Sequence, residues 1–451
     1  MANKTQLAEL GLFDAKVPRY TSYPTAPQFN TSVGPEEFTS WISAIVPGGE
    51  VSLYVHVPFC RRLCWFCACR TQGTQNDAPV LAYLQTLLAE LKLLKAKLPE
   101  GVRLSRLHWG GGTPTLLTPP MMSELAGAIA DVAPFAENYE FSVEIDPNEI
   151  DGPRLDALAA AGMNRASIGV QDFDEEIQKT IGRMQSFELT RDAVTEIRAR
   201  GVHSLNADIL FGLPDQSTAR ITQSVQKLLA LAPDRVALYG YAHVPWMAKR
   251  QQLIPSDKLP TPQERLELFE TARKLFLWDN YAEIGIDHFA LKGDGLEVAQ
   301  KSGALRRNFQ GYTDDPAEAL IGLGASSISR FPQGYAQNAP ATSAHTGKIR
   351  DGRFSTSRGH VFTADDKLRS RMIEMLMCDF AIDPVEILRD HAISRSDLSA
   401  MLSRVQSQFN GLLDLNDDRL SIPVAARPLT RMVARAFDAY DLSKAGHSSA
   451  I

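Results

Sequence analysis

The sequence predicts an α/β fold in which a parallel barrel is followed by a smaller, mainly helical, winged-helix-like domain. One observation is that β-type and helical segments alternate from about residue 50 to residue 330, which favours a parallel sheet or barrel. The other is that nearly every candidate strand ends in a short segment of glycine and polar residues. Because parallel barrels carry their active sites at the carboxyl ends of the strands, we expect these segments to converge.

Seven short runs of β-branched, aromatic and other apolar residues are candidate strands, since each is bounded by turn-forming or polar residues. The runs are 51–57, 104–109, 139–145, 165–170, 204–210, 235–241 and 282–288. In this order they lead into a cysteine-rich loop, Gly110-Gly-Gly-Thr-Pro-Thr, Glu144-Ile-Asp-Pro-Asn, Gly169-Val-Gln-Asp, Asp208-Ile-Leu-Phe-Gly-Leu-Pro, Tyr241-Ala-His-Val-Pro and Asp287-His-Phe.

Helical periodicity occupies the intervals between these runs. The clearest helix has Asp77 as its N-cap and Pro79 in its first turn, and its leucines then recur at i, i+3 and i+4 spacing as far as Leu94. Further helices are expected over 121–132, 187–199, 219–231 and 264–276.

Past about residue 360 the alternation gives way to helices over 364–377, 384–390 and 395–408, a hairpin over 412–422 and a last helix over 428–441. Helices followed by a short hairpin are typical of a winged helix, a fold that often binds DNA. The negative charge of this chain favours a role in covering a substrate instead. We therefore predict a wrapping segment over 1–45, a barrel domain over 46–355 and a C-terminal domain over 356–451.

Composition excludes several classes of function. The chain has 451 residues, 44% of them apolar and 22% charged, and its formal net charge is −6. This charge argues against a nucleic acid or an anionic membrane as the main partner, because both select clustered Lys and Arg. The N-terminus lacks the pattern of a signal peptide, and no run of about 18 apolar residues occurs. We expect a cytoplasmic protein.

Cysteine spacing is the most informative feature of the sequence. Only five cysteines occur, and four of them, Cys60, Cys64, Cys67 and Cys69, fall within ten residues. A disulfide framework would need separated pairs and an oxidising compartment. The fifth, Cys378, lies in an apolar stretch and is expected in the core.

The C-x3-C-x2-C spacing of Cys60, Cys64 and Cys67 suits three corners of an iron–sulfur cube, which normally takes four cysteines. Three ligands leave one iron open to chelate the amino and carboxylate groups of a methionine derivative. The alternative is structural zinc, which usually pairs two cysteine knuckles far apart in sequence. No second knuckle is present, so a cluster is favoured.

The cysteine loop and the segments around it resemble a known family. Cys60-Arg-Arg-Leu-Cys64-Trp-Phe-Cys67 is similar to the signature of the radical S-adenosylmethionine (SAM) superfamily, whose fold is a partial (β/α)6-type TIM barrel. The wider context resembles oxygen-independent coproporphyrinogen III oxidase (coproporphyrinogen dehydrogenase) over roughly residues 15–440. The matching segments are Tyr54-Val-His-Val-Pro-Phe-Cys, Cys69, Gly110-Gly-Gly-Thr-Pro-Thr, Gly169-Val-Gln-Asp-Phe, Asp287-His-Phe-Ala, Arg307-Asn-Phe-Gln-Gly-Tyr-Thr and Tyr335-Ala-Gln-Asn.

The resemblance implies an oxidoreductase of haem (porphyrin) biosynthesis that decarboxylates two propionates of coproporphyrinogen III to vinyl groups, giving protoporphyrinogen IX. It implies a [4Fe–4S] cluster and two molecules of SAM, cleaved to 5′-deoxyadenosyl radicals. It also implies a monomer that receives electrons from a flavodoxin or ferredoxin system.

The resemblance assigns site residues in three groups. The cluster ligands are Cys60, Cys64 and Cys67, whereas Cys69 matches in type without binding the cluster. The residues assigned to the cluster-bound SAM are Tyr54, Gly111, Glu144 and Ile328, and we also count Tyr54 as catalytic. The residues assigned to the second SAM are Phe66, Gly112, Thr113, Gln171, Arg183, Asp208 and Ala242.

For other residues the sequence allows either a functional or a structural role. His56 and His288 are either site residues or satisfied core histidines, and Arg61 and Arg62 either tune the cluster or face solvent. Since the implied substrate carries four carboxylates, Arg19, Arg306 and Arg307 are candidate cations for it. The rival functions are a haem chaperone of the same superfamily and a zinc-binding regulatory protein.

Overall fold

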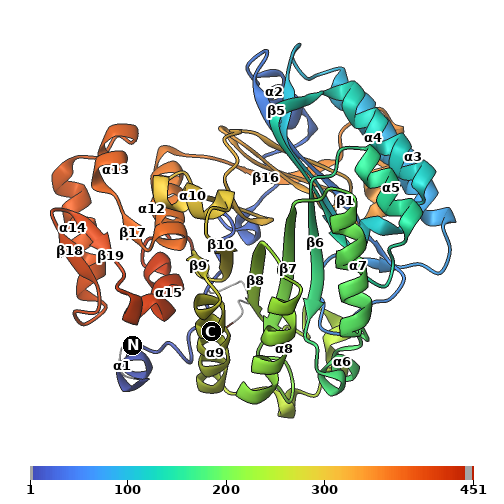
Figure 1. Cartoon of the computed structure of the whole chain (residues 1–451). Helices are drawn as coiled ribbons and strands as arrows, with labels where there is room; N and C mark the ends of the chain where they lie inside the picture. Colours follow the sequence, from blue (N-terminus) through green and yellow to red (C-terminus); the bar gives the residue numbers. More distant parts are fainter. Residues whose placement is uncertain (1–3, 442–448) are drawn as a thin grey trace.

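A computed structural model describes residues 4–441 and 449–451 of the chain. It contains a large α/β part and a smaller, mainly helical C-terminal part, which lies on the left of Figure 1 in orange and red. None of the helices in these residues is both long and apolar enough to cross a membrane.

The core of the α/β part is a run of parallel strands. In the described residues the large sheet has the order β16-β15-β14-β13-β1-β4-β5-β6-β7-β8-β10-β9, and the pairs from β13 through β8 are parallel. Because the two end strands of this order, β16 and β9, do not pair with each other, the barrel is partial, as predicted. The parallel strands are β1 (Glu50–Val57), β4 (Arg103–Gly111), β5 (Phe135–Ile145), β6 (Arg165–Gln171), β7 (Ser204–Phe211), β8 (Arg235–Gly240) and β13 (Leu320–Leu323).

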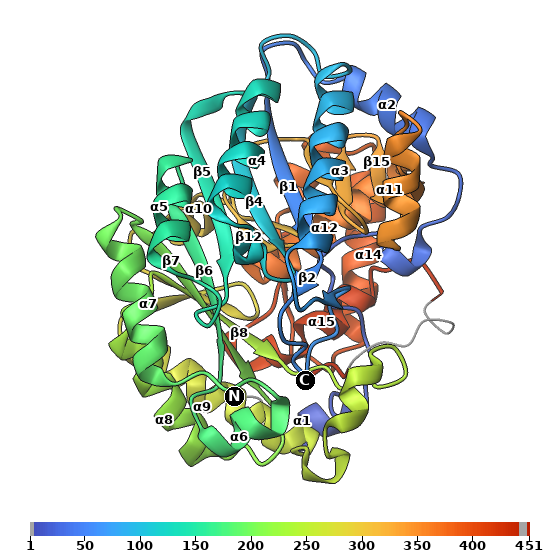
Figure 2. The ribbon, with the colours of Figure 1, turned by 90° about the vertical axis from the view of Figure 1, so that its right-hand side faces the viewer.

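Helices connect the parallel strands and cover their outer side (Figure 2). They are α3 (Ala78–Lys95), α4 (Pro119–Val132), α5 (Gly152–Ala160), α6 (Glu175–Ile181), α7 (Phe187–Ala199), α8 (Thr218–Ala230) and α9 (Pro262–Trp278). Leucines of α3 and the rings of Trp109 and Phe141 belong to one buried core between helices and sheet. Asp77 precedes α3 as predicted, but its carboxylate makes no capping bond and instead pairs with Arg61.

The prediction of one continuous strand over 282–288 is wrong, although 282–284 and 288 lie in strands. The chain forms β9 (Tyr281–Ile284) and β10 (His288–Leu291), which pair antiparallel around a turn at Gly285, where φ is +54°. A Cβ at this glycine would lie 2.1 Å from the Tyr312 ring, so only glycine lets the ring pack against the turn. As a result, β10 pairs antiparallel with β8 and ends the run of parallel strands.

A second group of elements, between residues 290 and 361, was not predicted from the sequence. The strands β14 (Ile328–Phe331), β15 (Gly334–Asn338) and β16 (Thr356–Val361) extend the sheet antiparallel beyond β13. The strand β13 and the helices α5 and α6 were not predicted either. Further unpredicted elements include β2 (Phe59–Cys60), β3 (Gln72–Gly73), α10 (Gly295–Ser302), β11 (Arg306–Asn308), β12 (Gly311–Thr313) and α11 (Thr342–Arg350).

The C-terminal part has the predicted winged-helix-like pattern. Its helices are followed by a hairpin, and the small sheet has the order β17-β19-β18. Leu376, Leu398, Leu402 and Leu420 are buried in a core of its own. The elements are α12 (Ala364–Asp379), β17 (Ala381–Ile382), α13 (Pro384–Asp390), α14 (Arg395–Ser407), β18 (Asp414–Asn416), β19 (Arg419–Ser421) and α15 (Thr430–Arg435).

The last helix is shorter than the predicted 428–441. Pro428 lies in a 3₁₀ turn, η5 (Val424–Leu429), and α15 stops at Arg435. Past this point the Asp438 carboxylate accepts bonds from the Tyr20 hydroxyl and the Tyr440 amide, 2.9 Å each. These bonds stabilise a turn in place of another helical turn.

The first 45 residues contact both parts of the molecule. Leu7 and Leu12, in and after α1 (Lys4–Glu9), are buried in the C-terminal core, whereas α2 (Pro35–Ser43) packs on the barrel core. The segment therefore ties the two cores together. The division of the chain at 45/46 and 355/356 remains a prediction, and β16 keeps the chain in the large sheet as far as Val361.

Truncating Leu402 tests the C-terminal core. Its side chain is fully buried in α14, so Leu402→Ala is expected to lower the free energy of unfolding by about 2–5 kcal/mol. Val385→Ala on α13 is the matched control, because Val385 is 70% exposed, and it should change stability by no more than about 0.5 kcal/mol. Urea unfolding of the two variants measures both, and equal effects would contradict the assigned packing.

Candidate active site

The cysteine loop leaves the carboxyl end of β1 and is fixed to two other parts of the barrel. The Trp65 amide donates to the Ile181 carbonyl over 2.9 Å at the end of α6. Gln251 donates to the Phe66 carbonyl over 2.6 Å, and Arg250 to the Cys69 carbonyl over 3.1 Å. The loop is thus held in place by the protein itself.

The three thiols of this loop lie near one another. Cys60, Cys64 and Cys67 are unpaired and half-buried, whereas Cys69 is exposed. Burial raises the pKa of Cys60 to about 11, and the neighbouring Cys67 and Cys64 also act to raise it. Hydrogen bonds from Cys69 lower the pKa of Cys67 to about 6, and its Sγ accepts from the Cys69 amide over 3.4 Å. The loop therefore already stabilises a thiolate.

This donor set fits a [4Fe–4S] cluster. In residues 4–441 and 449–451 no three His, Cys, Asp or Glu side chains converge as they do around a single metal ion. A structural zinc needs four donors, with sulfur at about 2.3 Å. A cube takes one thiolate at each iron, so its ligands stand further apart. Three half-buried thiols at C-x3-C-x2-C spacing therefore suit three irons of a cube.

Arg183 adds a positive charge beside the loop. Its Nη1 donates to Cys64 Sγ over 3.6 Å and lies 3.4 Å from Asp146 Oδ2, while its Nη2 donates to the Gly169 carbonyl over 2.9 Å. Burial would lower the pKa of Arg183, but Asp146 and Cys64 raise it. The guanidinium stays charged next to the thiols.

The glycine segment after β4 packs without room for side chains. A Cβ at Gly111 would lie 2.5 Å from the His56 ring, and one at Gly112 would lie 2.5 Å from the Phe59 carbonyl. The Gly111 amide donates to Glu144 Oε2 over 3.0 Å, and Gly111 has φ +110°. Glycine therefore brings this backbone close to the strand end that carries the cysteines.

Aromatic and acidic side chains line the space beside these glycines. The Tyr54 hydroxyl lies 2.9 Å from His56 Nδ1, and the Tyr54 ring stacks on His108. His108 Nε2 lies 3.3 Å from Glu144 Oε1. Burial alone would raise the pKa of Glu144, but His108 and the Gly111 amide lower it below its usual value. The carboxylate is therefore ionised and oriented.

A cavity of about 470 Å³ collects the residues assigned to the cluster-bound SAM. Tyr54, Gly111, Glu144 and Ile328 all line it, together with His56 and Cys69. They come from β1, β4, β5 and β14, which are far apart in sequence. The structure therefore brings this predicted set together in one cavity.

The residues assigned to the second SAM are more dispersed. Asp208 lines the same cavity, whereas Ala242 lines a neighbouring one. Gln251 links Ala242 to the cysteine loop, because its Nε2 donates to the carbonyls of both Phe66 and Ala242, over 2.6 and 3.1 Å. The Gly112 and Thr113 amides donate to the Val57 and Phe59 carbonyls. Gln171 ends β6 with φ +69°.

Burial raises the pKa of Asp208 to about 6, although Asn206 donates a 2.8 Å bond that acts in the opposite direction. A carboxyl group that titrates near neutral pH in a cavity is typical of functional sites.

The structure separates the open candidates. Arg61 pairs with Asp77, and Arg306 donates to the Gly303 and Leu305 carbonyls. Arg307 pairs with Asp287 at 3.5 Å and lies over the Tyr312 ring at 4.5 Å. His288 bonds Asp287 over 2.7 Å and faces the cavity near Tyr239. Cys378 is buried, as predicted.

Sequence reasoning missed Glu90, which organises the turn before β14. Fully buried in α3, it accepts 2.7 Å and 2.9 Å bonds from the Gly324 amide and Asn338. Tyr83 reaches the same turn, accepting from the Ala325 amide over 2.8 Å. A glutamate within an apolar helical stripe is the signal that could have revealed it. This network positions the strand that carries Ile328.

Comparison with known proteins agrees with this geometry. Residues 54–228 match the model of the radical SAM superfamily. An oxygen-independent coproporphyrinogen III oxidase of Paracoccus denitrificans is 68% identical over 451 residues, covering 100% of both chains. This chain belongs to the oxygen-independent coproporphyrinogen III oxidase family.

More distant members of the family preserve the same fold. A relative of that name from Escherichia coli is 35% identical over 97% of this chain and 96% of its own. A solved structure described as coproporphyrinogen III oxidase from Escherichia coli, a radical SAM enzyme, has a TM-score of 0.89 and 34% identity. It covers 95% of this chain and 100% of its own. The family and the fold class expected from the sequence are confirmed.

Replacing Gly111 tests the close approach of the backbone. Gly111→Ala is expected to weaken binding of SAM to the reconstituted protein at least about tenfold, because the added Cβ would displace His56 or the backbone. Gly127→Ala in α4 is the control, since a Cβ there meets nothing within 4 Å. Equilibrium dialysis with labelled SAM gives the affinities, and equal values for both variants would contradict the packing.

The pH dependence of stability tests Glu90. Burial raises its pKa to about 8 from an ordinary 4.5, so its contribution to stability is complete below pH 4.5 and is lost as the pH rises towards 8. Wild-type stability should therefore fall relative to that of Glu90→Gln between about pH 5.5 and 8, by an amount on the order of a few kcal/mol. Denaturant unfolding of the two cluster-free proteins at several pH values gives the free energy of unfolding of each as a function of pH. Parallel pH dependences would refute the assigned burial of Glu90.

Proposed function

We infer that this chain catalyses the oxygen-independent oxidative decarboxylation of two propionate side chains of coproporphyrinogen III, giving protoporphyrinogen IX. The observation that carries this proposal is the placement of three half-buried thiols in a loop whose Cys69 lines the same cavity as Tyr54, Gly111 and Glu144. The named relatives extend over the whole chain, which disfavours a haem chaperone or a zinc-binding regulator.

The chain's own groups hold and orient the reactants. Cys60, Cys64 and Cys67 are the proposed ligands of the cluster. Held by these thiolates, a [4Fe–4S] cluster would supply the electron that converts SAM into the 5′-deoxyadenosyl radical needed to remove hydrogen from a propionate. The ionised Glu144 can accept hydrogen bonds from SAM, and the Gly110–Gly112 backbone allows close contact. Tyr54 and His56 line the same cavity.

A second molecule of SAM is proposed near Phe66, Gly112, Thr113, Gln171, Arg183, Asp208 and Ala242. Support comes from Gln251, which connects the Phe66 and Ala242 backbones, and from Asp208, which shares the first cavity. Arg183 can offer a charged donor to a carboxylate.

We propose that the protein acts as a cytoplasmic monomer reduced by a flavodoxin or ferredoxin system, without a nucleic-acid or membrane partner. The formal net charge of −6 supports the last part of this proposal, since both excluded partners select basic surfaces.

Anaerobic turnover tests the function. The reconstituted protein, given SAM, a reductant and coproporphyrinogen III, is expected to release 5′-deoxyadenosine, CO₂ and protoporphyrinogen IX, measured by chromatography. Alanine at Cys60, Cys64 or Cys67 should abolish both iron binding and turnover, because the cube then loses a ligand. Cys69→Ala is the control and should retain iron. Cleavage of SAM without decarboxylation would indicate another substrate.

A further inference from the structure

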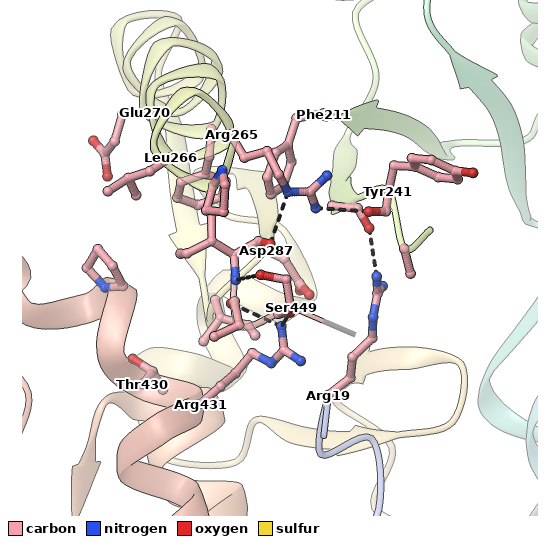
Figure 3. Close-up of a pocket in the computed structure, with 18 of the residues that line it drawn as sticks. Arg19, Phe211, Tyr241, Arg265, Leu266, Glu270, Asp287, Thr430, Arg431 and Ser449 are labelled. Carbon is pink, nitrogen blue, oxygen red and sulfur yellow. Dashed lines mark hydrogen bonds between the residues drawn. The ribbon is translucent and has the colours of Figure 1, made fainter. Parts of the chain in front are cut away.

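A second cavity, of about 380 Å³, lies next to the candidate active site (Figure 3). Gly240, Tyr241 and Ala242 line it where β8 ends, directly after Tyr239, which lines the first cavity. Asp287 lines the second cavity and its neighbour His288 the first. The two cavities therefore meet at the end of β8 and the start of β10.

Three arginines from distant parts of the chain point into this cavity. Arg19 comes from the N-terminal segment, Arg265 from α9 and Arg431 from α15, and Figure 3 shows their guanidinium groups around one space. Of the three, only Arg19 was a candidate from the sequence. Arg265 and Arg431 were missed because nothing in the sequence relates them to Arg19.

These arginines contact backbone oxygens in place of carboxylates. Arg19 donates to the Gly240 carbonyl over 2.7 Å, and Arg265 to the Tyr241 carbonyl over 2.9 Å. Arg431 donates to the Pro18 and Ala450 carbonyls over 3.0 Å each. Within residues 4–441 and 449–451, none of the three forms an ion pair with an Asp or Glu side chain.

Other interior arginines of the protein are neutralised. Arg235 pairs with Asp294 at 2.9 Å, and Arg371 with Glu374 at 2.8 Å. In both, burial would lower the pKa and the carboxylates raise it. In the cavity the result is opposite, because burial and the neighbouring Arg19 lower the pKa of Arg265 to about 10 and that of Arg431 to about 9.

The remaining charges of the cavity do not compensate this cluster. Arg273 and Arg427 bind Glu283, and Arg273 also contacts Glu270, so these four side chains balance one another. Asp287 is engaged by Arg307 and His288. The carbonyl of Ile451 accepts a hydrogen bond from Arg265 over 3.0 Å. Even a carboxylate at that position would balance only one of the three charges of Arg19, Arg265 and Arg431. Uncompensated charge in a cavity is costly unless an anion binds there.

The walls of the cavity are apolar and aromatic. Phe211, Phe269, Leu259 and Trp246 line it, and Trp246 is 60% exposed at the surface. A ligand suited to this lining combines an apolar body with one or more carboxylates. A tetrapyrrole with propionate side chains has this character, whereas inorganic anions lack the apolar part.

We propose that Arg19, Arg265 and Arg431 bind a propionate carboxylate of the tetrapyrrole substrate, one that anchors the macrocycle while another propionate faces the active-site cavity. This assignment rests on the proposed function. It also defines these arginines as determinants of substrate affinity, with no part in SAM cleavage.

Binding of coproporphyrin III, the stable oxidised porphyrin, tests the proposal without turnover. Arg265→Gln and Arg431→Gln are expected to weaken its binding about 10- to 100-fold, measured by fluorescence quenching, because each removes a charge-assisted hydrogen bond. Arg265→Lys, which retains the charge, should recover part of the affinity. Arg200→Gln is the matched control, since Arg200 is paired with Asp156 and Glu196 and lines neither cavity, and it should leave porphyrin binding unchanged.

Two further measurements distinguish a lost carboxylate contact from damage to the fold or to the SAM site. SAM affinity, measured in parallel, should be the same in all variants, and loss of SAM binding in place of porphyrin binding would overturn the assignment to a propionate. Arg19→Gln removes a side chain with a backbone contact at Gly240, so it tests the site if another variant fails to fold. Unchanged porphyrin affinity in all the glutamine variants would overturn the proposal.

The failure of this proposal is distinguishable from failure of the proposed function. If wild-type protein decarboxylates coproporphyrinogen III and the glutamine variants do so with unaltered KM, the function stands and the arginine site falls. If wild-type protein binds coproporphyrin III through these arginines but releases no CO₂ from coproporphyrinogen III, the function falls and the carboxylate site stands.

Discussion

Parallel pairing of β1 with its two neighbours is the constraint on which the rest of the structure depends. Tyr54 lies opposite His108 in β4 and opposite Gly322 in β13. This register places the loop after β1, the glycines after β4 and the turn before β14 at one edge of the sheet. Neither the thiols nor the aromatic wall would form a site if the register slipped, because one step reverses the face of every side chain.

Close packing at this edge has a chemical purpose. Glycines at 110–112 allow the Glu144 carboxylate, the His56 ring and the Phe59 carbonyl to approach the β4 backbone, which a larger residue would prevent. Buried polar groups are then satisfied from distant elements, as Glu90 shows for the β13–β14 turn. Such bonds fix the geometry that radical chemistry requires, because loosely held reactive groups lead to side reactions.

The distribution of charge distinguishes structural arginines from functional ones. Arg106, Arg235 and Arg371 are held by carboxylates and contribute to the architecture. The cluster of Arg19, Arg265 and Arg431 has backbone partners in the described part of the chain, and it unites the N-terminal segment, the barrel and the C-terminal part around one cavity. The small helical part thereby contributes to a binding site as well as to the covering of the barrel.

The sequence by itself determined the local chemistry: the cysteine spacing, the parallel strands that precede each polar segment, and the winged-helix-like pattern. These depend on short-range periodicity and on residue type, which can be read along the chain. Only the tertiary structure decided that 282–288 is an antiparallel turn, that Arg307 is already paired with Asp287, and that Glu90 supports the site. These facts depend on contacts between residues far apart in sequence, and no local pattern encodes which of many polar side chains will meet.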